Sequence, residues 1–179
     1  VYASISGFGQ TGPYADRPGL DQIAQGLGGH MSVTGKPGEG PVRSGAAISD
    51  MTAGFLVAGG IMAALLERHK SGEGQWLHTS LLQAQIFLLD FQAARWTVDG
   101  EVAPQEGNNH PTNVPMGTFK TADGYVNIAP MASMWSKFCA VMGLEDMEQD
   151  ENFATPGARF CHRREVDQRI EKVTVTQPT

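Results

Sequence analysis

The longest apolar run in the chain covers residues 51–66 (MTAGFLVAGGIMAALL), in which hydrophobic side chains follow one another without a polar face. A helix that is apolar all round is buried on most of its faces. The run is followed by the charged segment 67–70 (ERHK) and by Gly72, which are typical of a helix end. The pattern therefore predicts a long, buried helix that begins near Asp50.

Segments rich in β-forming residues lie on both sides of this helix. Residues 1–6 alternate in polarity and lead into a glycine-rich loop, and residues 75–79 form a short β-like run before a second apolar stretch, 81–98. Strands that alternate with helices indicate an α/β fold with a parallel sheet. A glycine loop after a parallel strand lies at the ligand-binding edge of such a sheet, although it can equally be a simple tight turn. The loop contains Gly7, Phe8 and Gly9 and carries neither of the common nucleotide-binding motifs.

The second half of the chain has a different pattern. Residues 99–115 lack periodicity and are rich in glycine, proline and asparagine, which predicts a linker. The runs 116–121 and 125–129 flank an Asp-Gly pair, which is a hairpin signal, and residues 133–142 form an amphipathic helix. Residues 158–176 could hold a frayed helix. We expect residues 1–98 to be part of a larger domain and residues 116–179 to begin a smaller α+β domain.

Composition and charge narrow the classes of function. The chain has 179 residues, 41% of them hydrophobic, and a net charge of −6, which argues against nucleic acid or an anionic membrane as the main partner. The apolar run is interrupted by Thr52 and by glycines and falls short of a spanning length, so we expect no membrane segment. The two cysteines, Cys139 and Cys161, form no disulfide framework, which favours the cytoplasm. The five histidines lack metal-ligand spacing, so we predict no metal site.

Asp50 stands at the start of the long apolar helix. Burial of a helix does not require an acid at its start, so the presence of Asp50 needs another explanation. Either Ser49 or Asp50 could serve as the N-cap, accepting hydrogen bonds from the first-turn N–H groups. The positive end of the helix dipole would also keep a nucleophilic carboxylate ionised. Residues 20–27 read as a short helix in which Asp21 is either a cap or a functional acid. Arg43 is either a solvated surface residue or a partner for a phosphate or carboxylate.

Four ordered blocks resolve some of these alternatives. They are residues 4–14 (SISGFGQTGPY), 18–21 (PGLD), 25–35 (QGLGGHMSVTG) and 44–50 (SGAAISD). In this order and spacing they resemble the class III CoA-transferases (CaiB/BaiF type), a family that includes formyl-CoA and carnitine CoA-transferases. The resemblance runs from Val1 to the end of the chain. Members of the family are much longer, so we interpret the chain as an internal piece.

The resemblance implies a function and a set of site residues. It implies a Rossmann-like domain with part of a smaller domain, in which Asp50 is the nucleophile that accepts the acyl group. It places Asp21 close to that carboxylate, and we expect Asp21, Gly7, Phe8, Gly9 and Arg43 to contribute to substrate or CoA binding. Acyl-CoA and a carboxylic acid would be substrates, with no tightly bound cofactor. Relatives form interlocked homodimers, which implies the same for the full-length protein.

Two other interpretations are weaker. Related α-methylacyl-CoA racemases use a histidine at the position of Leu20 and a glutamate shortly after the hairpin. Leucine cannot exchange a proton, and residues 130–136 contain no carboxylate, so a racemase is disfavoured. The piece alone could instead be a non-catalytic fragment, because the family's CoA site draws residues from the part of the chain that precedes Val1. His78 also departs from the acid that relatives usually have at that position.

Overall fold

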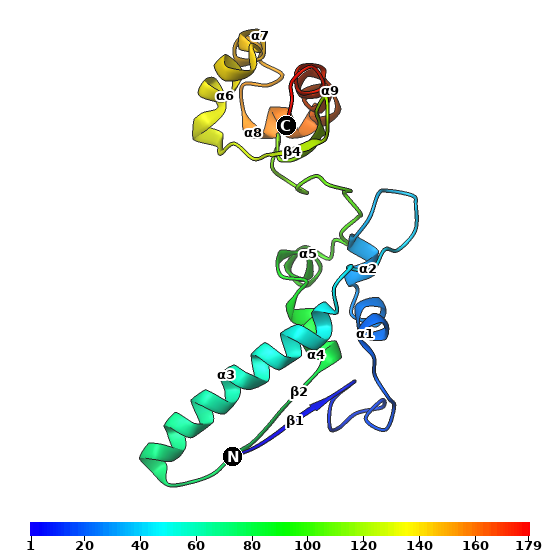
Figure 1. Ribbon diagram of the computed structural model, residues 1–179, viewed down its shortest axis with the longest axis vertical. Helices are drawn as coiled ribbons and strands as arrows, with labels where there is room; N and C mark the ends of the chain where they lie inside the picture. Colours follow the sequence, from blue (N-terminus) through cyan, green and yellow to red (C-terminus); the bar gives the residue numbers. More distant parts are fainter. The chain divides into compact units, whose positions relative to one another are not determined.

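The structure, a computed structural model, describes all residues from 1 to 179 (Figure 1). The chain divides into two compact units, Val1–Gly107 and Asn108–Thr179. The division falls within the segment 99–115, for which we predicted a linker.

The first unit is built on a parallel pair of strands. Strand β1 (Tyr2–Ser6) pairs with β2 (Trp76–Ser80), so that Tyr2 lies opposite Trp76 and Ser6 opposite Ser80. The helices α1 (Asp21–Leu27), α2 (His30–Val33) and α3 (Ile48–Ser71) connect the two strands, and α3 packs against both (Figure 1). This strand–helix–strand unit confirms the predicted α/β class.

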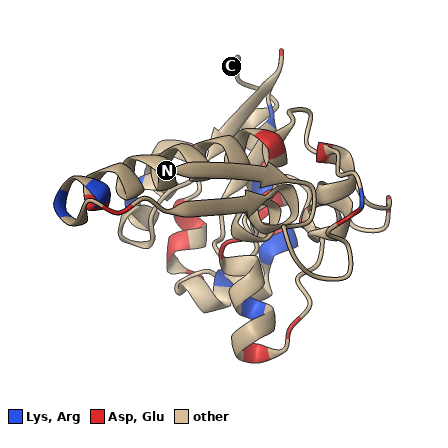
Figure 2. Cartoon of the chain, turned by 90° about the horizontal axis from the view of Figure 1, so that it is seen from below, with Lys and Arg blue, Asp and Glu red and all other residues tan.

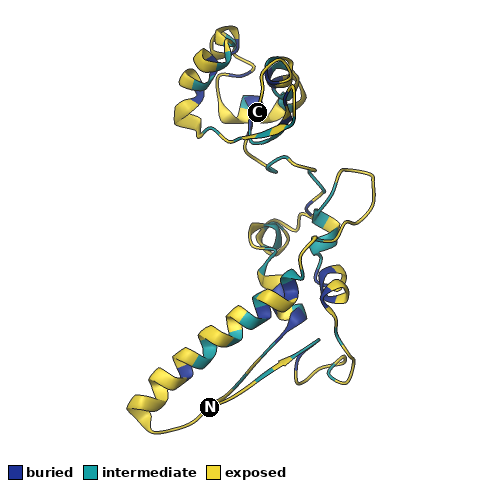
Figure 3. Cartoon of the chain, in the orientation of Figure 1, coloured by how far each residue is buried: buried dark blue, intermediate teal, exposed yellow.

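The long helix α3 is far less buried than its composition predicted. Only Ser49, Ala53 and Ala64 are buried, whereas Phe55 is 76% and Leu66 is 70% exposed (Figure 3). The prediction of a helix buried on most faces is wrong for this chain, because β1, β2, α1 and α4 contact only part of its surface. Its charged residues gather mainly at its last turn (Figure 2).

The length of α3 also corrects the argument about membranes. The helix extends beyond the apolar run to 24 residues and is long and apolar enough, by length and composition alone, to cross a membrane. The core helix of a soluble protein passes the same test. The expectation that the protein has no membrane segment therefore stays a prediction and cannot rest on helix length.

The second apolar stretch forms two helices where one was predicted. Helix α4 covers Leu81–Phe87 and α5 covers Phe91–Asp99. Between them Asp90 has a φ of 48°, which lies outside the right-handed helical region and interrupts the helix. Ser80 caps α4, since its side chain accepts a hydrogen bond from the Gln83 N–H group.

The segment predicted as a linker is attached to the two units at its two ends. Within the first unit, the Gln105 Nε2 atom donates to the Thr34 carbonyl oxygen at 2.7 Å, and the Gly107 N–H donates to Gly35 at 2.9 Å. Within the second unit, the His110 N–H donates to Met116 at 2.8 Å. Polar composition alone does not distinguish such bonded loops from free linkers.

The second unit contains the predicted hairpin and a helical core. Strands β3 (Gly117–Lys120) and β4 (Tyr125–Ile128) pair antiparallel, which confirms the hairpin prediction. They are followed by a short 3-10 helix η1 (Ala132–Met134) and by four helices: α6 (Trp135–Met142), α7 (Glu145–Gln149), α8 (Pro156–Cys161) and α9 (Arg163–Thr174). The core includes Phe119, Trp135, Met147, Phe153, Val166 and Ile170. The last helix is therefore part of the core, whereas the sequence had suggested a frayed tail.

The two cysteines differ in reactivity. Cys139 is fully buried, and burial raises the pKa of its thiol to about 11, whereas Cys161 is exposed. Because the thiolate is the reactive form, we expect iodoacetamide at pH 8 to modify Cys161 and to reach Cys139 only after denaturation. Mass spectrometry of digested peptides measures this difference. Rapid modification of Cys139 in the folded protein would contradict the packing described for α6.

Candidate active site

The N-terminus of α3 is not capped by either of the predicted residues. The helix begins at Ile48, its N-cap position is Ala47, and no side chain at that position accepts a hydrogen bond. Ser49 and Asp50 are already the second and third helical residues. The predicted capping role of Ser49 or Asp50 is therefore wrong, and the first-turn N–H groups need another acceptor.

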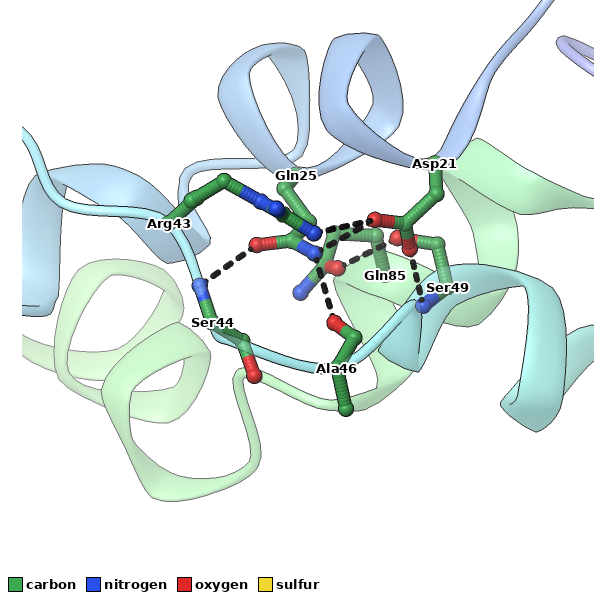
Figure 4. A network of polar contacts seen from close by, with 7 residues as sticks. All are labelled: Asp21, Gln25, Arg43, Ser44, Ala46, Ser49 and Gln85. Carbon is green, nitrogen blue, oxygen red and sulfur yellow. Dashed lines mark hydrogen bonds and ion pairs between the residues drawn. The ribbon is translucent and has the colours of Figure 1, made fainter.

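Asp21, on a different helix, provides that acceptor. Its Oδ1 atom accepts a hydrogen bond from the Ser49 N–H at 2.9 Å (Figure 4). Asp21 does not cap its own helix, because it is the first residue of α1 and Leu20 occupies the N-cap position. The carboxylate thus joins the start of α1 to the start of α3, next to the position of Asp50.

The other carboxylate oxygen of Asp21 has two partners. Its Oδ2 atom accepts a hydrogen bond from Gln25 Nε2 at 2.7 Å and lies 3.8 Å from the Arg43 guanidinium. The Asp21 side chain is 11% exposed and that of Arg43 is 44% exposed. Asp21 also acts on His30, where burial lowers the pKa of the imidazole and the negative charge of Asp21 offsets part of that effect.

Two buried glutamines complete this polar network, and the sequence reading did not identify them. Gln25 accepts a hydrogen bond from the Ser44 N–H at 2.8 Å and donates to the Ala46 carbonyl oxygen at 3.3 Å. Gln85 of α4 accepts a hydrogen bond from the Ser49 hydroxyl at 2.7 Å (Figure 4). Both glutamines are fully buried, each next to a buried alanine in its helix. The sequence carries no motif for them, because their distinguishing feature is the burial of an amide, which only the structure shows.

The glycine loop is held beside the start of α1. A Cβ atom added to Gly7 would lie 2.5 Å from the Gly19 Cα, so the two backbones approach too closely for any other residue. Gly9 has a φ of +107°, and its N–H group donates to the Ser6 hydroxyl at 3.0 Å. Phe8 packs edge-on against Tyr14 at 5.6 Å. The Gly9 N–H thus already has a partner, its φ favours glycine, and a role of Gly9 in substrate binding stays a prediction.

Asp50 itself is exposed, on the first turn of α3 and directly after the buried Ser49. The partial positive charge of the helix N-terminus stabilises an ionised carboxylate at this position. A thioester could approach this side chain, which a sealed interior would have prevented. Asp21, Arg43 and the entry to α3 are brought together by hydrogen bonds and an ion pair, and Gly7 joins them through its contact with Gly19.

Asp50 lies on the first turn of α3, in a unit built on the parallel strands β1 and β2, and ligands of open α/β sheets bind at the carboxyl ends of the strands. The sequence model of CoA-transferase family III matches residues 1–179, and the chain belongs to this family. This result confirms the resemblance seen in the four sequence blocks.

Individual relatives agree with this assignment. The chain is 39% identical over 176 residues to a succinate–glutarate CoA-transferase of Agrobacterium fabrum, covering 98% of this chain and 44% of that protein. It is 35% identical to a succinyl-CoA:mesaconate CoA-transferase of Haloarcula hispanica, covering 98% of this chain and 45% of that protein. A crystal structure of a CaiB/BaiF family protein from Brucella suis matches with a TM-score of 0.83 and 35% identity, covering 99% of this chain and 47% of that one. The chain thus spans less than half the length of these relatives.

Proposed function

We propose that the protein containing this chain transfers CoA between carboxylic acids and that Asp50 is its nucleophile. The observation that supports this proposal most directly is the placement of Asp50. Its carboxylate is exposed, while the residue before it is buried and held by Asp21. A nucleophile of this kind must be accessible to a large substrate and still be fixed in direction.

The reaction would proceed in four steps that conserve the energy of the thioester. An oxygen of Asp50 attacks the thioester carbonyl carbon, the C–S bond breaks, and CoA leaves as a thiolate, which gives a mixed anhydride between Asp50 and the donor acyl group. The thiolate then attacks the Asp50 carbonyl carbon, which forms an aspartyl thioester and releases the donor acid. The acceptor carboxylate attacks this thioester to give a second mixed anhydride and free thiolate. The thiolate finally attacks the acceptor's acyl carbon, which yields the new acyl-CoA and restores Asp50.

The surroundings of Asp50 would assist these steps in two ways. Each tetrahedral intermediate carries an oxyanion, and one well-placed N–H donor stabilises such an anion by about 3 kcal/mol. The half-exposed guanidinium of Arg43 could bind a phosphate of CoA or a substrate carboxylate, since Asp21 contacts it at 3.8 Å and leaves much of it free. Coenzyme A enters this scheme as a substrate and not as a bound cofactor.

The names of the relatives suggest which acids to test. Two of them act on succinate or succinyl-CoA together with a second dicarboxylic acid. We therefore propose dicarboxylates as substrates. We also propose that the full-length protein is cytoplasmic, on the basis of its cysteine content, and that it forms an interlocked homodimer, on the basis of the family resemblance. The racemase alternative stays disfavoured, because Leu20, at the position of the racemase histidine, has no exchangeable proton.

A direct assay tests the proposed function. The full-length protein, mixed with succinyl-CoA and either glutarate or mesaconate, is expected to form the corresponding acyl-CoA and free succinate in equal amounts, measured by liquid chromatography and mass spectrometry. Omission of the acceptor acid is the control and should leave succinyl-CoA largely intact. Release of free CoA, with no new thioester from any dicarboxylate or monocarboxylate offered, would refute CoA transfer.

A further inference from the structure

We propose that Gln25 and Gln85, here called the glutamine pair, are positioning residues that fix the direction of the Asp50 carboxylate. This inference rests on the proposed function, because it assigns a role to residues that support the nucleophile. The hydrogen bonds of the two glutamines go to the segment 44–49, which includes the start of α3 and ends directly before Asp50.

Gln25 fixes the beginning of that segment. Its side-chain oxygen accepts the Ser44 N–H, while its Nε2 group donates both to the Ala46 carbonyl and to Asp21 (Figure 4). One amide group therefore makes three hydrogen bonds, and only one of its two orientations satisfies all of them. A residue that cannot both accept and donate would leave at least one of these buried or half-buried groups without a partner.

Gln85 fixes the end of the segment, although only one of its two side-chain polar atoms has a hydrogen-bond partner. Its Oε1 atom accepts the hydrogen bond from the Ser49 hydroxyl, whereas its buried Nε2 group has no hydrogen-bond partner. A Cβ atom added to Gly28 would lie 2.5 Å from the Gln85 Cγ, so Gly28 provides the room for this side chain between α1 and α4. Burying an amide with an unpaired N–H is unfavourable, and an apolar residue would suit stability better. The useful contact of Gln85 is thus its bond to Ser49.

Ser49 connects the glutamine pair to the reaction. Its N–H is bound by Asp21 and its hydroxyl by Gln85, so two helices fix the residue that directly precedes Asp50. Loss of either bond allows the first turn of α3 to shift. A displacement of about 1 Å of a reacting group lowers a rate by roughly a hundredfold.

A double-mutant cycle in the full-length protein tests this role. The variants are Ser49→Ala, Gln85→Leu and the double variant, and Gln83→Leu, at an exposed position of the same helix, is the matched control. The measurements are the single-turnover rate of acyl transfer from succinyl-CoA to Asp50, trapped with hydroxylamine, and the Kd for succinyl-CoA. We expect each single variant to lower the rate about 10- to 100-fold with little change in Kd. The double variant should be no slower than the slower single variant, because both changes remove the same bond.

The outcomes separate this inference from the proposed function. Hydroxylamine labelling of Asp50 in the unmodified protein, together with unchanged rates in Ser49→Ala and Gln85→Leu, would overturn the positioning role alone. Additive effects of the two substitutions would overturn it as well. If Asp50 in the unmodified protein is not labelled at all, the proposed function fails and the inference with it. Should Gln85→Leu fail to fold, the single variants Ser49→Ala and Gln25→Leu, with the exposed Gln22→Leu as control, are compared by the same rate and Kd, and unchanged rates in both would overturn the positioning role.

Discussion

Replacement of Asp50 by alanine or asparagine in the full-length protein is expected to lower CoA transfer by about 10⁴-fold or more, to the limit of detection. Alanine removes the attacking oxygen, and the neutral amide of asparagine is a poor nucleophile. Because Asp50 is exposed and has no role as the N-cap of α3, neither substitution should unfold the protein. The loss is thus expected in the rate of acyl transfer, while binding of acyl-CoA is largely kept.

Two measurements make this prediction specific. Hydroxylamine added during turnover should convert the side chain of residue 50 into a hydroxamate, found by peptide mass spectrometry in the unmodified protein and missing from both variants. Glu67→Gln is a suitable control, since it neutralises another exposed carboxylate on the same helix, near its C-terminal end. Transfer at an unaltered rate by Asp50→Ala, or a hydroxamate at any other acid, would remove Asp50 from the reaction.

The parts of the fold that the sequence predicted well depend on local chemistry. The Asp-Gly turn between 116–121 and 125–129 predicted the hairpin, and the short helix predicted for residues 20–27 is α1. The alternation of strand and helix patterns predicted the parallel pairing of β1 with β2. For the hairpin and for α1 the signal lies within a few residues of the feature, whereas the parallel pairing was predicted from the order of strands and helices along the chain.

The features that were missed depend on contacts between distant segments. Ser49 needs no local cap because Asp21 accepts its N–H, and no pattern within residues 44–50 shows this. The exposure of Phe55 follows from which elements pack on α3, and hydrophobicity alone does not specify that. The composition of a segment thus limits the secondary structure that it can form, and the segments that pack against it determine its burial and its hydrogen-bond partners.

The candidate site shows the same division. Asp50 and Asp21 were identified through the resemblance, and the structure connects them through Ser49. The glutamine pair was not identified, because a glutamine in a helix is usually exposed and carries no motif. What distinguishes the two glutamines is that their polar amides are fully buried. This burial is known only from the structure.

The second large effect is expected at Asp21, where alanine and asparagine should differ. Alanine leaves the Ser49 N–H without an acceptor and the Gln25 Nε2 group with only the Ala46 carbonyl oxygen, which should cost the local structure about 3 kcal/mol. Amide exchange of residues 44–50, measured by hydrogen–deuterium exchange and mass spectrometry, should then become roughly a hundredfold faster. The rate of acyl transfer should fall by roughly the same factor, because the turn that carries Asp50 loses its support.

Asparagine tests the hydrogen-bond geometry separately. Its oxygen can still accept the Ser49 N–H, but its NH2 group then faces Gln25 Nε2, so that two donors meet. Gln25 must turn its amide over, which removes the acceptor of the Ser44 N–H. We therefore expect faster exchange in Asp21→Asn mainly at residue 44, and in Asp21→Ala also at residue 49.

The pKa of His30 provides an independent readout of the same substitution. Burial lowers this pKa, and the charge of Asp21 raises it in part. Loss of that charge in Asp21→Asn removes the favourable interaction with the imidazolium, so the pKa of His30, measured by NMR titration, should fall further. Asp16→Asn, at an exposed acid of the preceding loop, is the control and should leave both exchange and titration unchanged. An unchanged or higher pKa of His30 in Asp21→Asn, with protection of residues 44–50 intact, would show that Asp21 does not connect α1 to the start of α3.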